Sequence, residues 1–466
     1  MLLADTISDT KLCKRAVDKL VQKELRAGVQ TIQYQLNTLM TTHGKSPFVT
    51  LFLDIDDTNE YVDEVAEIVN EILQQRIQGI KNEKGVYTTP AFPKLVYPLY
   101  EHNTHTDGKF YHVTKTAVEC TSKRLYPDYI SSKKMSEVYE GHVFAPMGCR
   151  SFLSPWKDEN GDYKFEGRFN QGVVNLNIPQ IGIIANKDLD LFWTLLDERL
   201  ELCYEALMVR HNSLKGTLSD VSSTHWQYGA IARLRSGETI DKYLTDGYST
   251  ISLGYIDLYE LTKLMTGESH TTEVGQAFAL ELLTYMKQVV DKWKHQTGIG
   301  FGLYGTPAES LCYRFARIDK HNFGVIEDVT DKGYYTNSYH VDVRENIDAF
   351  SKLEFESQFQ QISTGGGISY TEIPNMQHNL DALEQLVLYI YDNIQYAEMN
   401  TKSDCCHEWL FEGEMLIKDD LTWYCPNCGN DDHSKMNVIR RTCGYLGYNM
   451  WNKGKTAEIG LRVMDL

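Results

Sequence analysis

Four cysteines near the end of this 466-residue chain have the chemistry of a metal site. Cys425 and Cys428 are separated by two residues, which is the spacing of a thiolate pair that binds tetrahedral zinc. Cys405 and Cys406 lie upstream and are the other two candidate ligands, with His407 as an alternative nitrogen ligand. Because adjacent cysteines bind one ion only through a distorted turn, a three-coordinate or metal-free site stays open.

A glycine-containing segment follows this cluster. Residues 440–447 have the sequence RRTCGYLG, with glycines at Gly444 and Gly447. Glycine lets the backbone turn, or lets another chain segment approach closely. An isolated glycine is usually only a turn, so this segment is ambiguous when it is taken alone.

A further cysteine lies in residues 146–153, which have the sequence PMGCRSFL. Cys149 follows an expected strand and precedes a polar loop. A lone cysteine is commonly a small buried hydrophobic residue, and its position alone favours that interpretation over a catalytic thiol.

Amide side chains are dense in residues 167–179, at the start of another expected strand. Asn170 is the candidate for a polar group lining a site, and Asn175 and Asn177 are weaker ones. A neutral amide could orient a hydroxyl group without adding an ionisable competitor. Asparagine at a strand start is, however, most often a turn former or a backbone cap.

Residues 300–305 have the sequence GFGLYG, a literal GxGxxG. A dinucleotide-binding fingerprint needs a strand directly before these glycines, and residues 293–297 do not supply one. We therefore expect the glycines to lie within a strand. Downstream, Thr306, Pro307 and Glu309 fit the N-cap, N1 and N3 positions of a capping box, which predicts that a helix begins here.

Apolar periodicity predicts an α/β fold. Residues 11–40 and 60–80 repeat apolar side chains at three- and four-residue steps, the period of amphipathic helices. Short apolar runs alternate with further helical patterns, which favours a large barrel or wound sheet. The other expected helices are 190–211, 272–294 and 380–395, and the expected strands are 48–55, 94–97, 173–178, 299–304 and 368–372.

Composition limits the function classes. The chain has 46 Lys and Arg against 64 Asp and Glu, a net charge of −18, which opposes binding to nucleic-acid polymers. We find no basic n-region, and no apolar run long enough to span a bilayer, so no membrane association and a cytoplasmic location are expected. Ten cysteines in such a chain would stay reduced, and their clustering favours metal or radical chemistry over disulfides.

Together and in this order, the segments around Cys149 and Gly444 resemble those of the anaerobic (class III) ribonucleotide reductases, which are glycyl radical enzymes. The resemblance covers about residues 30–466. It implies a glycyl-radical-enzyme-type α/β barrel, incomplete at its N-terminus, with a C-terminal zinc-binding module and a radical loop. The expected domains are a catalytic barrel over 1–400 with a finger loop near 146–153, a zinc-ribbon-like module over 401–433, and the radical loop and tail over 434–466.

The resemblance implies an oxygen-sensitive ribonucleoside-triphosphate reductase. A radical-SAM activating enzyme would remove a hydrogen atom from Gly444, which would oxidise Cys149 to a thiyl radical that abstracts the ribose 3′-hydrogen. Formate or a dithiol protein would supply electrons as water leaves from C2′. Asn170 would line the active site, and Glu309 would exchange protons with the ribose or the reductant. Zn²⁺ would be held by the four candidate cysteines.

Family members carry a longer N-terminal region than this chain. A companion polypeptide that supplies the missing part is therefore expected, together with the family's homodimer. Two other functions stay open: a non-catalytic zinc-binding assembly protein, and a nicotinamide-dependent oxidoreductase that would bind NAD tightly.

Overall fold

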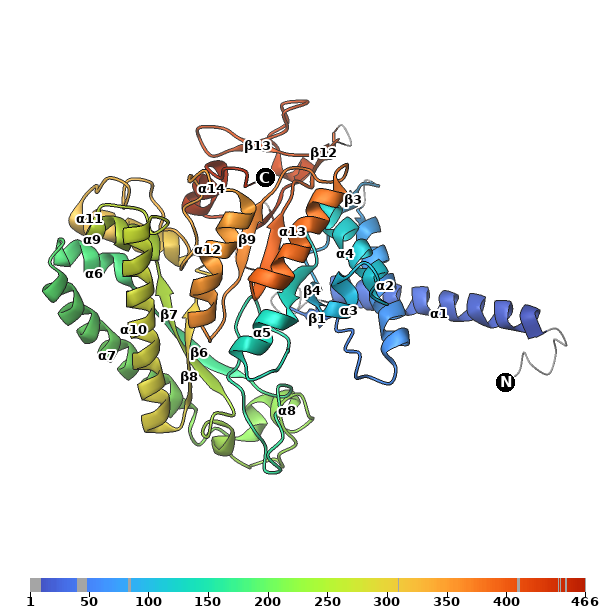
Figure 1. The fold of residues 1–466 in the computed structure, drawn as a ribbon, viewed down its shortest axis with the longest axis horizontal. Coiled ribbons are helices and arrows are strands. Elements are labelled where there is room, and N and C mark those ends of the chain that lie inside the picture. The colour runs from blue at the N-terminus through green and yellow to red at the C-terminus, as the bar shows by residue number, and fades with distance from the viewer. Residues whose placement is uncertain are drawn as a thin grey trace.

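A five-stranded sheet forms the centre of the molecule (Figure 1). The computed structural model describes residues 10–39, 48–82, 85–308, 310–408, 411–442, 444, 446–448 and 451–465. In the central sheet the strand order is β1-β4-β5-β10-β9, and neighbouring strands are parallel except β5 and β10. The strands are β1 (Thr50–Phe52), β4 (Lys94–Leu99), β5 (Asp128–Ser131), β9 (Ser369–Glu372) and β10 (Tyr396–Asn400).

The two faces of the five-stranded sheet differ because side chains alternate along a strand. Leu95, Tyr97 and Ala397 belong to a large apolar core that also contains residues of the helices packed on that face. Lys94 and Glu398 are in the opposite register and therefore face the other way. The helices of this core are α2 (Val62–Gln78), α4 (Tyr111–Arg124), α12 (Ala349–Ile362) and α13 (Leu380–Asn393).

A second sheet has three parallel strands in the order β6-β7-β8. Leu176, Leu253 and Leu303 form a core with the helices on one face. The opposite face of the sheet carries polar side chains and glycines. The strands are β6 (Asn170–Asn177), β7 (Thr250–Ile256) and β8 (Gly300–Gly305), and the covering helices are α6 (Ile178–Ala185), α7 (Leu189–Leu214), α9 (Leu258–Thr266) and α10 (Glu273–Thr297).

The C-terminal residues form small sheets beside the five-stranded sheet, at the top of Figure 1. β11 (Asp404–Cys406), β12 (Phe411–Gly413) and β15 (Met436–Asn437) make one, and β13 (Leu416–Ile417) pairs with β14 (Trp423–Tyr424). β16 (Ile439–Arg441) and β17 (Leu446–Tyr448) form a hairpin whose turn contains Gly444. Ile439 and Leu446 belong to the core of the five-stranded sheet, so this hairpin is anchored to it.

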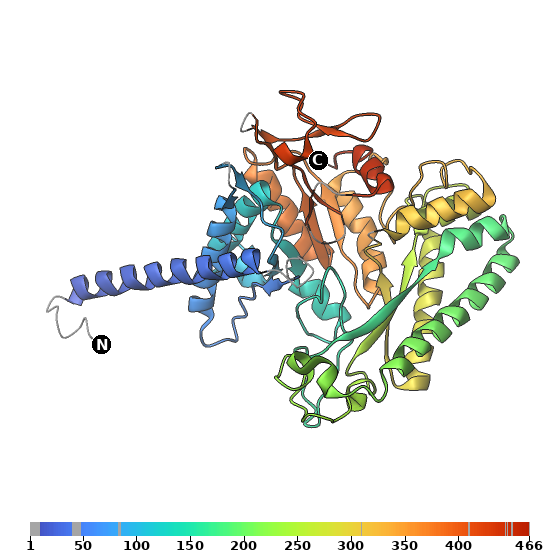
Figure 2. The ribbon, with the colours of Figure 1, turned by 180° about the vertical axis from the view of Figure 1, so that it is seen from behind.

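The N-terminal helix α1 (Thr10–Thr38) extends away from the body of the molecule (Figure 2). Several of its apolar side chains are exposed, with Leu20 at 48% and Val21 at 50%, whereas Val29 is buried. The remaining elements are β2 (Ile80–Lys81), β3 (Tyr87–Thr88), α3 (Glu101–Thr104), α5 (Ser132–Val138), α8 (Ser223–Trp226), α11 (Leu311–Phe323) and α14 (Lys453–Gly460).

The expected α/β alternation is confirmed. The predicted long helices correspond to α1, α2, α7, α10 and α13, and the strand expected at 48–55 is the shorter β1. The glycines of residues 300–305 lie within strand β8, as predicted. The division into three domains stays a prediction. In the part of the chain that the structure describes, no helix is long and apolar enough to cross a membrane.

Candidate active site

Cys149 and Gly444 are in direct contact although they lie far apart in the sequence. Gly444 is buried and has a φ of +85°, a conformation that residues with a side chain rarely adopt. A Cβ atom built on Gly444 would lie 2.8 Å from the carbonyl oxygen of Cys149 and 3.5 Å from its Cβ. Both the backbone conformation and the space therefore require glycine at this position.

Cys149 lies in a tight antiparallel turn. Met147 and Ser151 exchange two backbone hydrogen bonds, with N···O distances of 2.7 and 3.2 Å. Phe152 continues the segment, donates its backbone N–H to the Gly365 carbonyl at 2.9 Å and is fully buried. Residues 147–152, here called the Cys149 segment, thus carry Cys149 near their tip. Backbone hydrogen bonds and aromatic packing fix the base of this segment.

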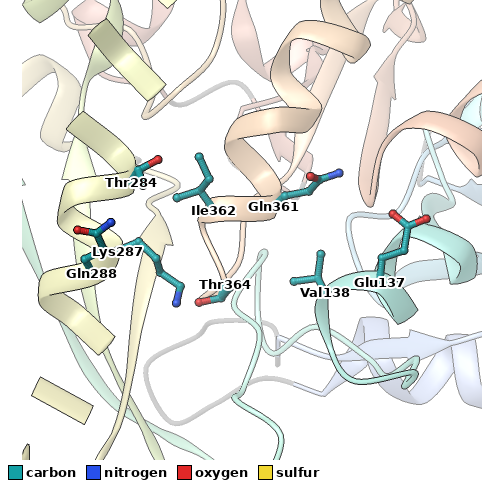
Figure 3. A pocket seen from close by; sticks show the side chains of 8 residues that line it. All are labelled: Glu137, Val138, Thr284, Lys287, Gln288, Gln361, Ile362 and Thr364. Atoms are coloured by element: carbon teal, nitrogen blue, oxygen red, sulfur yellow. The ribbon is translucent and has the colours of Figure 1, made fainter. Parts of the chain in front are cut away.

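A glycine turn connects the base of this segment to the three-stranded sheet. The Gly365 N–H donates to the Leu303 carbonyl of β8 at 2.7 Å. A Cβ built on Gly366 would lie 2.0 Å from the Arg150 carbonyl oxygen, so the two backbones meet where no side chain fits. Thr364, just before the turn, lines a separate pocket of about 420 Å³ between α5, α10 and α12 (Figure 3). Neither Cys149 nor Gly444 is among the described residues that line that pocket.

Buried charges hold the stem of the hairpin that carries Gly444. Arg441 forms ion pairs with Asp128 of β5 and with Glu398 of β10, the latter at 2.8 Å, and all three side chains are fully buried. Burial by itself lowers the pKa of Arg441, but the two carboxylates more than offset this and raise it. Burial raises the pKa of Glu398, against the opposite effect of Arg441. Arg441 also donates its backbone N–H to the Asn400 amide oxygen at 3.1 Å.

The Asn170 amide lies at the base of the Cys149 segment. Its nitrogen donates to Ser252 Oγ at 3.0 Å and has a longer contact of 3.5 Å with Ser151 Oγ. Its oxygen accepts the Gly172 backbone N–H at 2.7 Å. The structure therefore places Asn170 beside Ser151, two residues after Cys149, and shows it joining β6, β7 and the Cys149 segment. Its role in lining an active site stays a prediction.

The other two amides have internal partners. Asn175 accepts a hydrogen bond from Thr306 Oγ at 2.6 Å, and a Cβ on Gly254 would lie only 2.0 Å from the Asn175 oxygen. Gly254 therefore makes room for this bond above β7. Asn177 donates to Asp319 at 2.7 Å and caps α6. Asn177 has a structural role in this arrangement.

The predicted capping box is wrong. Helix α11 begins at Leu311, and its N-cap is Ser310, which makes no side-chain cap bond. The Thr306 hydroxyl bonds to Asn175 on another strand, because a tertiary partner is closer than the local N–H groups. Glu309, the remaining candidate of the sequence analysis, lies outside the described residues.

Three of the candidate metal ligands come together. The Sγ atoms of Cys406, Cys425 and Cys428 all lie within 4.8 Å of one another, and those of Cys406 and Cys428 are 3.6 Å apart. Three thiolates bound to zinc at about 2.3 Å would have comparable separations, so these residues fit the ion. Cys405 lies outside this group among the described residues, because adjacent residues of strand β11 point to opposite faces.

The electrostatics of this group favour a thiolate at Cys406 and not at Cys428. A backbone hydrogen bond at Asn430 lowers the pKa of Cys428, but burial and contacts with the two other cysteines raise it overall. Burial alone would raise the pKa of Cys406, but hydrogen bonds from the backbone at Glu408 and from the side chains of Cys428 and Asn430 lower it overall. Asn430 Nδ2 lies 3.7 Å from the Cys406 sulfur. His407, the alternative ligand, lies with Nε2 3.5 Å from Asn82 Nδ2.

Sequence reasoning missed the charged residues that support the site. Asp128 and Glu398 are the only charged residues of strands β5 and β10, and each is fully buried. A charged residue within such a strand is the signal that could have found them, because an ionised group is buried only with a partner. The partner itself, Arg441, is not visible from local sequence.

Solved structures show the class of fold. The fold is similar to that of an anaerobic ribonucleotide reductase from Thermotoga maritima in complex with dATP and CTP, with a TM-score of 0.66 and 18% identity, covering 93% of this chain and 69% of that chain. It is also similar to a Roseburia inulinivorans protein of 1,2-propanediol dehydration, with a TM-score of 0.52 and 11% identity, covering 94% of this chain and 61% of the other. The chain thus has the α/β fold of these proteins.

Sequence comparison identifies the family. The family model described as anaerobic ribonucleoside-triphosphate reductase matches residues 4–464. The curated reductase of this name from Escherichia coli K12 is 41% identical over 453 residues, which are 95% of this chain and 62% of the relative. The one from Enterobacteria phage T4 is also 41% identical over 453 residues, covering 95% of this chain and 72% of the relative. The chain belongs to the anaerobic ribonucleoside-triphosphate reductase family, and it spans about three fifths of the length of its Escherichia coli relative.

Proposed function

We propose that this chain carries out the anaerobic reduction of ribonucleoside triphosphates to deoxyribonucleoside triphosphates by glycyl and thiyl radical chemistry, in the cytoplasm. The contact between Gly444 and Cys149 is the observation that supports this most strongly. A glycine radical needs a backbone without a side chain, and transfer of a hydrogen atom needs a thiol within contact distance. The family to which the chain belongs supports the substrate class.

The proposed reaction begins with hydrogen-atom transfer. A radical-SAM activating enzyme removes one α-hydrogen from Gly444. The S–H bond of Cys149 then breaks as a Cα–H bond forms on Gly444, which leaves the unpaired electron on sulfur. The thiyl takes the 3′-hydrogen of the ribose, and water leaves from C2′. Formate, which becomes carbon dioxide, or a dithiol protein, which becomes a disulfide, supplies two electrons. One proton completes the leaving water, another hydrogen is added at C2′, and the 3′-hydrogen returns from Cys149, so that the product is a deoxyribonucleotide and water.

The neighbouring polar groups have proposed roles in binding. Asn170 orients a ribose hydroxyl, since its amide lies at the base of the Cys149 segment and adds no ionisable group there. Glu309 exchanges protons with the ribose or the reductant as a general acid and base.

Loss of the thiol should abolish turnover. Cys149→Ser keeps the size of the side chain but replaces the weak S–H bond by a strong O–H bond, so deoxyribonucleotide formation by the activated protein should fall to background. Cys312→Ser is the matched control, because that buried thiol bonds to the Thr336 carbonyl and lies in another core. Substantial turnover by Cys149→Ser under anaerobic conditions would contradict the proposal.

We further propose that Cys406, Cys425 and Cys428 hold Zn²⁺ as a structural ion. Zinc would cross-link β11 to the loop after β14 and so stabilise a module with little apolar core of its own. Cys425→Ser should lose bound zinc, measured by elemental analysis, and make residues 404–437 sensitive to proteolysis. Cys405→Ser is the control and should retain the metal. Retention of zinc by Cys425→Ser together with loss by Cys405→Ser would contradict this ligand set.

The proposed active unit includes a further N-terminal region, on a companion polypeptide, and two copies of the catalytic unit. β6 and β8 are the two edge strands of their sheet, and most residues of β6 are half-exposed, whereas β7 and β8 are buried. Several apolar side chains of α1, including Leu20 and Val21, are also exposed. An open edge and an exposed apolar helix are features that a partner chain covers. In the curated relatives the matched region is part of one longer chain, so size-exclusion chromatography with and without an added N-terminal region tests this proposal.

A further inference from the structure

Lys94, the first residue of β4, contacts both Cys149 and Gly444, the two candidate radical residues. Its ammonium group donates one hydrogen bond to the Cys149 carbonyl oxygen at 2.5 Å and another to the Gly444 carbonyl oxygen. The side chain is fully buried and forms an ion pair with Asp128 Oδ2 at 2.8 Å. An ammonium group has three N–H donors, and these three oxygens account for all of them.

Two further groups surround the Lys94 ammonium group. Asp128 also accepts a hydrogen bond from the Tyr396 hydroxyl at 2.9 Å, and the face of the Tyr396 ring lies 5.3 Å from the Lys94 nitrogen. A carboxylate and an aromatic face both stabilise a cation.

The Asp128 carboxylate connects the stem and the tip of the β16–β17 hairpin, which carries Gly444. Asp128 pairs with Arg441, three residues before Gly444, and with Lys94, which binds Gly444 itself. Lys94 and Arg441 balance Asp128 and Glu398, so the buried group of four has no net formal charge. Charges can be buried when they are paired in this way, and such a network fixes the geometry of the backbones it contacts.

We propose that Lys94 is a positioning residue for hydrogen-atom transfer between Gly444 and Cys149. By binding both carbonyl oxygens, it holds the two backbones in contact. It also polarises the carbonyl of Gly444, into which the unpaired electron of a glycine α-radical delocalises, and so stabilises the radical. This inference rests on the proposed function, because it assumes that Gly444 and Cys149 exchange a hydrogen atom.

Two variants separate this role from a purely structural one. Lys94→Met removes the charge and the donors at nearly constant length. Lys332→Met is the matched control, because Lys332 is also buried, pairs with Glu260 at 2.5 Å and lies over the Tyr259 ring at 4.8 Å, but near α9. Both variants lose a buried lysine ion pair, and only the first loses contacts to Cys149 and Gly444.

The main readout is product formed per glycine-centred spin, measured anaerobically in the activated protein with its companion region present. Normalising to spins removes differences in folding and in activation. Lys94→Met should form roughly ten-fold less product per spin, because the two backbones lose the charge-assisted hydrogen bonds that hold them in contact, and this loss outweighs the lower stability of the glycine radical. Its α-proton doublet should widen as spin density returns to the α-carbon. Lys332→Met should match the parent protein in both measurements. Equal product per spin and an unchanged doublet in Lys94→Met would overturn the proposal.

A second measurement does not depend on the radical. Hydrogen–deuterium exchange should be faster in the Lys94→Met variant at residues 147–151 and 440–447, and unchanged there in Lys332→Met. If Lys94→Met does not fold, Lys94→Gln, which keeps two N–H donors without the charge, is measured in the same way. Unchanged exchange in both segments would overturn the positioning role. A parent protein with no glycine-centred doublet, but with faster exchange in the Lys94 variant, would support the clamp and refute the proposed radical function.

Discussion

The two sheets that contact the Cys149 segment do so with different chemistry. The five-stranded sheet presents fully buried charges, with Lys94, Asp128 and Glu398 on one face. The three-stranded sheet presents uncharged groups, including Asn170 and the serine Ser252 to which it bonds. The charged side fixes the chain's own backbone, and the neutral side leaves hydroxyl and amide groups near the thiol without a competing ionisable group. The five-stranded sheet thus holds the Cys149 segment by charge, whereas the three-stranded sheet holds it by uncharged hydrogen bonds.

The largest expected effect on stability comes from removing the shared anion of the charged sheet. Asp128→Asn leaves Lys94 and Arg441 buried with less compensation, which should lower the free energy of unfolding by about 3–5 kcal/mol. Chemical denaturation monitored by circular dichroism measures this difference.

A buried aspartate of helix α11, Asp319, offers a matched control for that experiment. Asp319 is also fully buried, but its hydrogen-bond donors are uncharged: Asn177 at 2.7 Å, Gln180 at 2.6 Å and Tyr335 at 2.9 Å. Asp319→Asn should cost less, about 1.5–3 kcal/mol, because it weakens hydrogen bonds from uncharged donors and leaves no buried cation without its partner. Equal losses in the free energy of unfolding would show that the ion pairs of Asp128 contribute no more to stability than the hydrogen bonds of Asp319.

Two buried glutamates should give opposite dependences of stability on pH. Burial alone would raise the pKa of Glu372, but Arg462 and Lys402 offset this and lower it to about 2. Its contribution to stability is therefore present above its ordinary pKa near 4.5 and is lost as the pH falls from 4.5 toward 2. Burial raises the pKa of Glu356 to about 7, with Lys352 only partly opposing this. Because folded Glu356 retains its proton, stability should fall as the pH rises from about 4.5 to 7.

Replacing either glutamate should remove the pH dependence of stability that it causes. Since a pKa difference of one corresponds to about 1.4 kcal/mol, each glutamate accounts for about 3 kcal/mol across its range. Glu372→Gln should flatten the acid limb of a stability profile, and Glu356→Gln the limb between about pH 4.5 and 7. Urea titrations at several pH values measure both. A Glu356→Gln profile that still falls over that range would show that another group is responsible.

The smallest expected effect is on the neutral sheet. Thr306→Val removes the hydrogen bond to Asn175 at 2.6 Å while keeping the shape of the side chain, and should cost about 1 kcal/mol. Thermal unfolding measures this loss. A cost as large as that of Asp128→Asn would mean that the neutral face, too, determines the stability of the site.

The sequence correctly predicted the helices and strands whose pattern is set by their own residues. The amphipathic helices and the apolar strands β4 and β8 were found because their periodicity is local. β7 was missed, since its sequence TISLGYI carries Ser252 and Gly254 on the face toward the Cys149 segment. The capping prediction failed at Thr306 because its hydroxyl bonds to a residue 131 positions away.

The site was predictable only in part. The pairing of Cys149 with Gly444 came from family resemblance, and their contact in the structure agrees with it. Lys94 could not be found from the sequence, because the carbonyl groups that it binds lie 55 and 350 positions away. Cys405 was chosen to replace a ligand of the family pattern that is Trp409 in this chain, and the direction of side chains along β11 leaves it outside the three-cysteine group.

The most direct test of the account is an anaerobic EPR spectrum of the protein after incubation with its activating enzyme, S-adenosylmethionine and a reductant. We predict a glycine-centred doublet that is absent from Gly444→Ala. The doublet should collapse to a singlet when the protein is produced in cells supplied with α-deuterated glycine. A doublet that persists in Gly444→Ala would place the radical elsewhere. The absence of any signal, with the companion region present and the activating enzyme shown to act on another substrate, would contradict radical chemistry at Gly444.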